Sequence, residues 1–104
     1  MISAIVDASH ELATRYLMEG RWRSAERAVV TGLTVEPGME RLWRTRILAA
    51  HSSGNPAAVQ EAINRLLAIT DELGGDLEPE TEQLLADLRK PDATHRNQVT
   101  AHAR

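Results

Sequence analysis

Apolar side chains recur every three to four residues along most of the chain, and no segment alternates regularly between apolar and polar positions. The first pattern is typical of amphipathic helices, whereas alternation would indicate strands. The sequence therefore predicts an all-α protein of about five helices, at residues 2–19, 22–33, 38–53, 56–72 and 79–89. Because only Val99 and scattered alanines are apolar after residue 89, we expect one domain over residues 1–89 and a polar C-terminal tail over 90–104.

Glycine and proline mark where these helices begin and end. Gly20 and Gly54 follow the first and third helices, and glycine adopts at little cost the left-handed conformation that closes many helices. Asn55 is well placed as the N-cap of the fourth helix, with Pro56 at its first position, and Gly74 follows its end.

Each predicted helix has one apolar face, which we expect to form the core. The expected core residues are Ile5, Leu12, Ala13, Tyr16, Trp22, Ala25, Val29, Leu33, Met39, Trp43, Ile47, Ala50, Val59, Ala62, Ile63, Leu66 and Leu67. Trp22 lies between two arginines, and we expect it to be buried while Arg21 and Arg23 face water. The alternative is that these three residues contact phosphates and bases.

The sequence also carries a period of 34 residues. This shift superimposes four pairs, namely Gly20 on Gly54, Ala28 on Ala62, Val29 on Ile63 and Leu33 on Leu67. A fixed period of this length indicates stacked helical hairpins. Counted from Gly20, an aromatic residue follows at two positions, Ala at five and Pro at seventeen. This spacing resembles the tetratricopeptide repeat.

Residues 4–89 resemble the bacterial transcriptional activator domain, a helical domain of actinobacterial regulators. The resemblance consists of a Leu-rich helix, a Gly, an Ala-rich helix, a Leu-Gly step and a Pro-x-Thr helix start, here at 42–50, 54, 57–67, 73–74 and 79–81. It departs at Ser9, where the repeat usually has a large aromatic residue, and at Arg46, where it has Leu. The resemblance implies a non-catalytic domain of a transcriptional regulator that dimerises or contacts a partner protein.

That family reads DNA through a winged-helix domain placed before the helical one, so the resemblance implies no direct DNA binding by this chain. It also implies a concave groove, which a fifth helix could close. The residues expected to line this predicted groove are Asp7, His10, Thr14, Leu17, Met18, Arg41, Arg44, Leu48, His51 and Ser52.

Two arginines one turn apart, Arg41 and Arg44, give the predicted groove its chemistry, because guanidinium groups bind carboxylates or phosphates through paired hydrogen bonds. An alternative function follows, in which the chain is a free-standing peptide-binding adaptor. The more ordinary interpretation is that both arginines pair with nearby acids such as Glu36 or Glu40.

Charge is unevenly distributed along a chain whose formal net charge is -3. Residues 1–52 have seven arginines and six acids, whereas residues 71–87 have seven acids and no basic residue. Net negative charge is the reverse of what a dedicated nucleic-acid binder usually shows. The acidic stretch is either a solvated connection or a dock for the Arg-rich half of a second copy, which would give a homodimer.

No residue pattern indicates catalysis. The absence of cysteine excludes disulfides and thiolate metal sites. His10-Glu11 resembles the start of a zinc-protease motif, but Thr14 stands where the second histidine is needed. We therefore expect no metal, no cofactor and no enzymatic activity. The sequence lacks an apolar run long enough for a membrane span and a recognisable signal peptide, so we expect a cytoplasmic protein.

Overall fold

The structure is a computed structural model that describes residues 2–89. It contains five helices over this range: α1 (Ile2–Met18), α2 (Trp22–Val35), α3 (Glu40–Ser52), α4 (Pro56–Glu72) and α5 (Pro79–Arg89). The predicted all-α class and the five predicted helices are confirmed to within two residues at each end. The expected polar tail, 90–104, lies outside the described residues. Across residues 2–89, no helix combines the length and apolar character that a membrane span requires.

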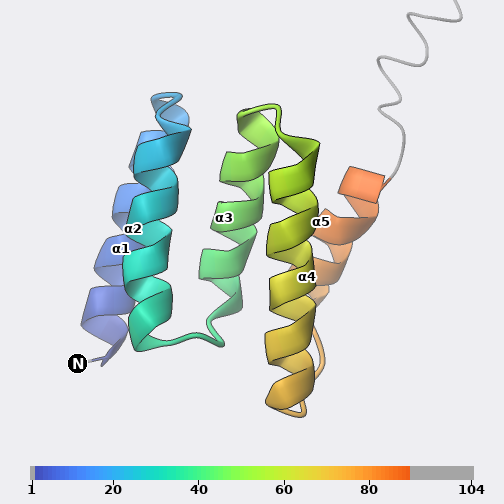
Figure 1. Cartoon of the computed structure of the whole chain (residues 1–104). Helices are drawn as coiled ribbons and strands as arrows, with labels where there is room; N and C mark the ends of the chain where they lie inside the picture. The colour runs from blue at the N-terminus through green and yellow to red at the C-terminus, as the bar shows by residue number, and fades with distance from the viewer. Residues whose placement is uncertain (1, 90–104) are drawn as a thin grey trace, which may run out of the picture.

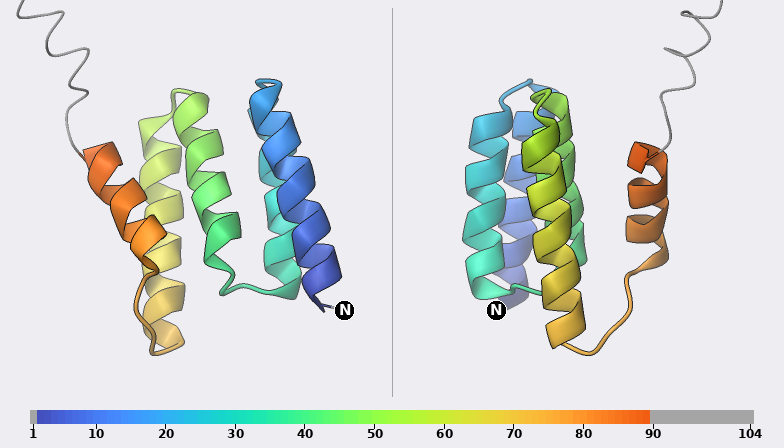
Figure 2. Two further views of the ribbon diagram at one scale, coloured as in Figure 1. Left: turned by 180° about the vertical axis from the view of Figure 1, so that it is seen from behind. Right: turned by 45° about the vertical axis from the view of Figure 1, so that its right-hand side comes forward.

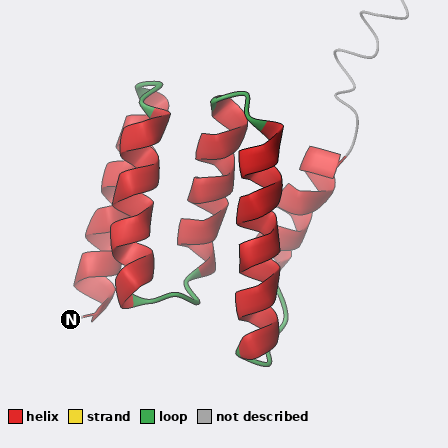
Figure 3. Cartoon of the chain, in the orientation of Figure 1, coloured by secondary structure: helices red, strands yellow, loops and turns green. Residues whose placement is uncertain are grey.

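The helices pack in sequence as adjacent antiparallel neighbours (Figure 1). Each of the first three packs against the next, and α3 also contacts α1 and α5. Seen from behind and from the side, α1, α3 and α5 lie on one face of the molecule and α2 and α4 on the other (Figure 2). Only loops and turns connect the helices in the described part of the chain (Figure 3). The third helix is therefore the central element.

Two helix-ending glycines form turns of the same geometry, 34 residues apart. Gly20 and Gly54 have φ angles of 74° and 73°. Each is followed by a residue whose N–H donates back across the turn, from Arg21 to the carbonyl of Tyr16 at 2.8 Å and from Asn55 to that of Ala50 at 3.4 Å. Because this left-handed conformation strains any residue with a Cβ, glycine is required at both positions.

The core is centred on α3. Leu42, Trp43 and Ile47 are all buried, and Trp43 donates a hydrogen bond from Nε1 to the carbonyl of Pro37 at 2.7 Å. The other buried apolar residues are Val6, Ala13, Ala25, Ala28, Val29, Leu33, Ala49, Ala62, Leu66 and Leu85. The prediction that Trp43 anchors the core is confirmed.

Four of the expected core residues are exposed instead. Ile5, Leu12, Trp22 and Leu67 keep between 40% and 48% of their surface in water. On α1 the buried side carries Val6, Ser9 and Ala13, so Ile5 and Leu12 lie on its flank. The prediction that Trp22 is a core anchor is therefore wrong. It is the first residue of α2 and is only partly covered by the neighbouring helix α3.

Ser9 is buried at the closest approach of three helices. A methyl group added to Gly32 of α2 would lie 2.7 Å from Leu42 Cδ1 of α3 and 2.9 Å from Ser9 Cβ of α1. A large aromatic side chain at position 9 would need this same space. The departure at Ser9 is thus matched by Gly32, and two small residues let the helices pack closely.

Candidate functional site

Five residues of the predicted groove line one open hollow. Asp7, His10, Thr14 and Met18 from α1 and Arg41 from α3 surround a space of ≈ 750 Å³ with Glu11 and Arg15. We call this surface the α1–α3 hollow. Met18 at its edge is 84% exposed. Its walls carry both signs of charge, so it offers polar contacts around one flexible apolar side chain.

Inside this hollow Arg41 does not pair with a neighbour on its own helix. Its Nη2 donates to Oδ1 of Asp7, which joins α3 to α1. The expectation that Glu36 or Glu40 would hold this arginine is wrong, because the packing of α1 beside α3 brings a carboxylate from further away. The side chain of Arg41 remains 37% exposed, whereas its Nε is buried with no hydrogen-bond partner.

The second arginine of the predicted groove, Arg44, forms hydrogen bonds with residues at the start of α5. Arg44 Nη1 donates to Oε1 of Glu78 at 2.7 Å and to the hydroxyl of Thr81 at 2.9 Å. Glu40 accepts a further bond from the backbone N–H of Glu78 at 2.8 Å. Thr81 is fully buried. These contacts place the start of α5 over this part of the predicted groove, so Arg44 is not free to bind a ligand.

The remaining groove residues are separated from the α1–α3 hollow. Leu17 is half-buried and packs against the core. Leu48, His51 and Ser52 are exposed on α3 but do not line the hollow. The structure therefore brings together the first-helix part of the predicted site with Arg41 and leaves the rest of α3 apart from it.

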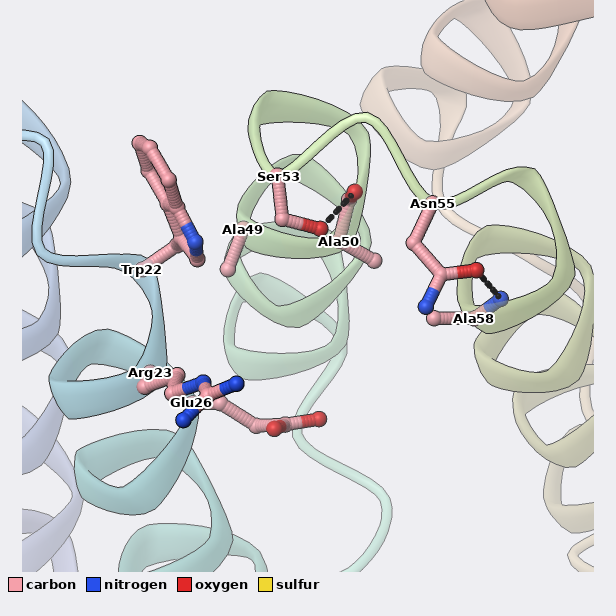
Figure 4. Close-up of a pocket in the computed structure, with 8 residues that line it drawn as sticks. All are labelled: Trp22, Arg23, Glu26, Ala49, Ala50, Ser53, Asn55 and Ala58. Atoms are coloured by element: carbon pink, nitrogen blue, oxygen red, sulfur yellow. Dashed lines mark hydrogen bonds between the residues drawn. The ribbon is translucent and has the colours of Figure 1, made fainter.

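A second site, which sequence reasoning missed, is formed by Trp22. Figure 4 shows its ring on α2 facing the small side chains of α3 across a space of ≈ 290 Å³. We call this the Trp22 slot; it is lined by Trp22, Arg23, Glu26, Ala49, Ala50, Ser53, Asn55 and Ala58. The signal in the sequence is the set of alanines opposite, which are too small to cover an indole ring.

Some of the charged side chains near this slot form ion pairs and others do not. Glu26 is paired with Arg46 at 3.7 Å, and Arg46 also lies over the Trp43 ring at 5.5 Å from its centroid. Arg23 and Arg27 are exposed one turn apart on α2. Neither forms an ion pair with any carboxylate of residues 2–89. The lining of the Trp22 slot therefore includes one arginine, Arg23, that has no carboxylate partner within residues 2–89, and Arg27 lies one turn further along α2.

Two further hollows have apolar linings. One lies between α4 and α5 and measures ≈ 480 Å³; its apolar residues are Ile63, Leu67, Leu77, Leu85 and Leu88. The other, ≈ 370 Å³, lies on the flank of α1 around Ile5, Ala8 and Leu12. Leu73 is the most exposed leucine, at 68%, and directly follows α4. Within residues 2–89, no group of three or more His, Asp or Glu is placed to hold a metal ion.

Comparison with protein-family models, with curated proteins and with solved structures gave no match.

Proposed function

We propose that this chain is a non-catalytic protein-interaction domain of a bacterial transcriptional regulator and that it works by pairing with a second copy of itself. The helices form a tetratricopeptide-like stack in this proposal. Its sequence basis is the resemblance to the bacterial transcriptional activator domain. Its structural support comes from two features, the spacing of the ion pairs and the distribution of charge.

The ion pairs between helices follow the period of the sequence. Asp7 pairs with Arg41, and Arg44 pairs with Glu78, so both contacts join residues 34 positions apart. They link α1 to α3 and α3 to α5. Equivalent positions of successive hairpins meet in this way when hairpins stack with a constant offset. This spacing supports the repeat architecture and hence a surface used for protein contacts.

The observation that carries self-association is the separation of unpaired charge. Arg23 lies in the first turn of α2 and Arg27 one turn further on. The acidic α4–α5 connection lies at the opposite end of the helix stack from the α1–α2 turn (Figure 1). Residues 53–89 contain eight acids against two arginines. A surface with opposite charges at its two ends is complementary to a second copy turned end for end.

Co-purification of two differently tagged copies tests this function. One copy is captured on a resin through its tag, and the second copy is detected through the other tag. We expect the second copy to be retained at low salt and released as the salt concentration is raised, because exposed charges are screened. The matched control is a copy denatured before mixing. Failure to retain the second copy at any salt concentration would contradict self-association.

The α1–α3 hollow favours a second function, the capture of a peptide from another protein. Its specific support is the side chain of Met18, which is almost fully exposed beside Arg41. If the hollow binds acidic peptide tails, the double variant Met18→Glu and His10→Glu should lose that binding. Labelled acidic peptides measure this directly, and Glu61→Gln, an exposed residue of α4 outside the hollow, serves as the control. Unchanged peptide binding in the double variant would rule out this function.

A further inference from the structure

We propose that the Trp22 slot of one copy receives Leu73 of a second copy. The acidic residues around Leu73 would then lie against Arg23 and Arg27. A two-fold axis makes this contact twice, once in each direction. The inference rests on the proposed self-association and names the surfaces that carry it.

The slot has the features of an energetically important contact. Trp22 is 40% exposed and lies beside Ala49 of α3 at one side of the slot (Figure 4). The space between them, ≈ 290 Å³, is open to an incoming aliphatic side chain. Tryptophan and arginine are the residues most enriched at the centres of protein interfaces, where covering an exposed ring removes apolar surface from water.

Leu73 is presented on a defined turn. Its N–H donates to the carbonyl of Ile69 at 3.0 Å, and Gly75 donates to that of Thr70 at 3.2 Å. Gly74 closes the turn with a φ angle of 70°. These bonds hold the backbone on both sides of a leucine that is 68% exposed. An apolar side chain displayed in this way fits a slot better than one on a loose loop, because less conformational freedom is lost on binding.

The charged residues around Leu73 are opposite in sign to the arginines on α2 near the Trp22 slot. Asp71, Glu72 and Asp76 are exposed around Leu73 and form no ion pair within residues 2–89. Arg23 in the lining of the slot and Arg27 one turn further along α2 lack carboxylate partners in the same part of the chain. Opposite charges around an apolar contact speed association and fix its orientation. The two surfaces thus carry opposite charges beside exposed apolar side chains.

A charge-exchange experiment tests the contact in the full chain. One variant carries Arg23→Glu and Arg27→Glu, and the other carries Asp71→Lys and Glu72→Lys. Each variant alone should dimerise about tenfold or more weakly than the wild type, because like charges oppose each other in both contacts. An equimolar mixture should recover the dimer, since one contact is then wild-type and the other is exchanged. The control is Arg15→Glu, which reverses the charge of an exposed arginine on α1, outside the proposed contact.

Leu73→Ser tests the apolar part, with Leu48→Ser as a second exposed leucine for comparison. We expect only Leu73→Ser to weaken the dimer and to abolish the blue shift of tryptophan emission on concentration, because the ring of Trp22 is no longer covered. Circular dichroism of each variant verifies folding. If the wild type dimerises and every variant dimerises equally well, the proposed contact is wrong, whereas self-association itself is supported. A wild type that stays monomeric would overturn both.

Discussion

The two tryptophans show how one residue type serves two purposes in this chain. Trp43 sits in the middle of the helix stack with its indole N–H bonded to Pro37 and only 3% of its surface exposed. Trp22 begins α2 and faces alanines across an open slot. Hydrophobic spacing treats both as core residues because it counts position within a helix. It does not register the size of the side chains on the neighbouring helix.

Truncating each tryptophan to alanine should therefore have unequal effects on stability. We expect Trp43→Ala to lower the free energy of unfolding by about 3 to 5 kcal/mol, the usual cost of removing a large buried aromatic side chain. Trp22→Ala should cost about 1 kcal/mol or less, since much of its surface is already in water. Urea denaturation followed by circular dichroism measures both. Equal losses would mean that Trp22 is buried after all.

A smaller change tests the contact between α1, α2 and α3. Gly32→Ala places a methyl group 2.7 Å from Leu42 Cδ1 and 2.9 Å from Ser9 Cβ, so the Leu42 side chain and α1 must shift. Overpacking of this kind costs about 1 to 3 kcal/mol. Gly75→Ala is the control, because nothing lies within 4 Å of a methyl group there. Thermal unfolding should show a lower midpoint for the first variant alone, and a tolerated Gly32→Ala would refute the close approach.

At the scale of the helices, local chemistry determined most of what the sequence could predict. Gly20, Gly54 and the Asn55–Pro56 pair act within one turn, and the helix ends that they indicate were confirmed. The Asn55 side chain does accept a hydrogen bond from the N–H of Ala58, at 3.1 Å. The partners of Arg41 and Arg44 could not be predicted in this way. They lie 34 residues away, and their proximity depends on how whole helices pack.

The attachment of α5 depends on one of these distant contacts. Arg44→Leu removes the guanidinium that bonds Glu78 and Thr81, and leaves the buried Thr81 hydroxyl without this partner. We expect the amides of residues 79–89 to exchange with solvent markedly faster, while those of α2 stay protected. Hydrogen exchange followed by mass spectrometry measures this. The exposed Arg65→Leu is the control, and uniform exchange rates in both variants would show that Arg44 does not hold α5.

At the scale of the whole molecule, the sequence predicted the charge asymmetry but not its geometry. The grouping of acids at 71–87 is visible in the sequence, and so is the Arg-rich first half. Two facts needed the fold: Arg41 and Arg44 form ion pairs with other helices or their connections, and Arg23 and Arg27 have no carboxylate partner within residues 2–89. Only five of the residues predicted to line the groove therefore lie together, in the α1–α3 hollow. The surface that we propose for a second copy instead includes Trp22 at the start of α2 and Leu73 at the end of α4.

The most direct test of the central claim is the molar mass of the wild-type chain in solution. Light scattering after size exclusion measures it over a wide range of protein concentration, at low and at high salt. Self-association predicts a mass approaching twice 11.5 kDa as concentration rises, with a weaker dimer at high salt. A mass of 11.5 kDa at every concentration and salt would contradict the claim that this domain works by pairing with itself.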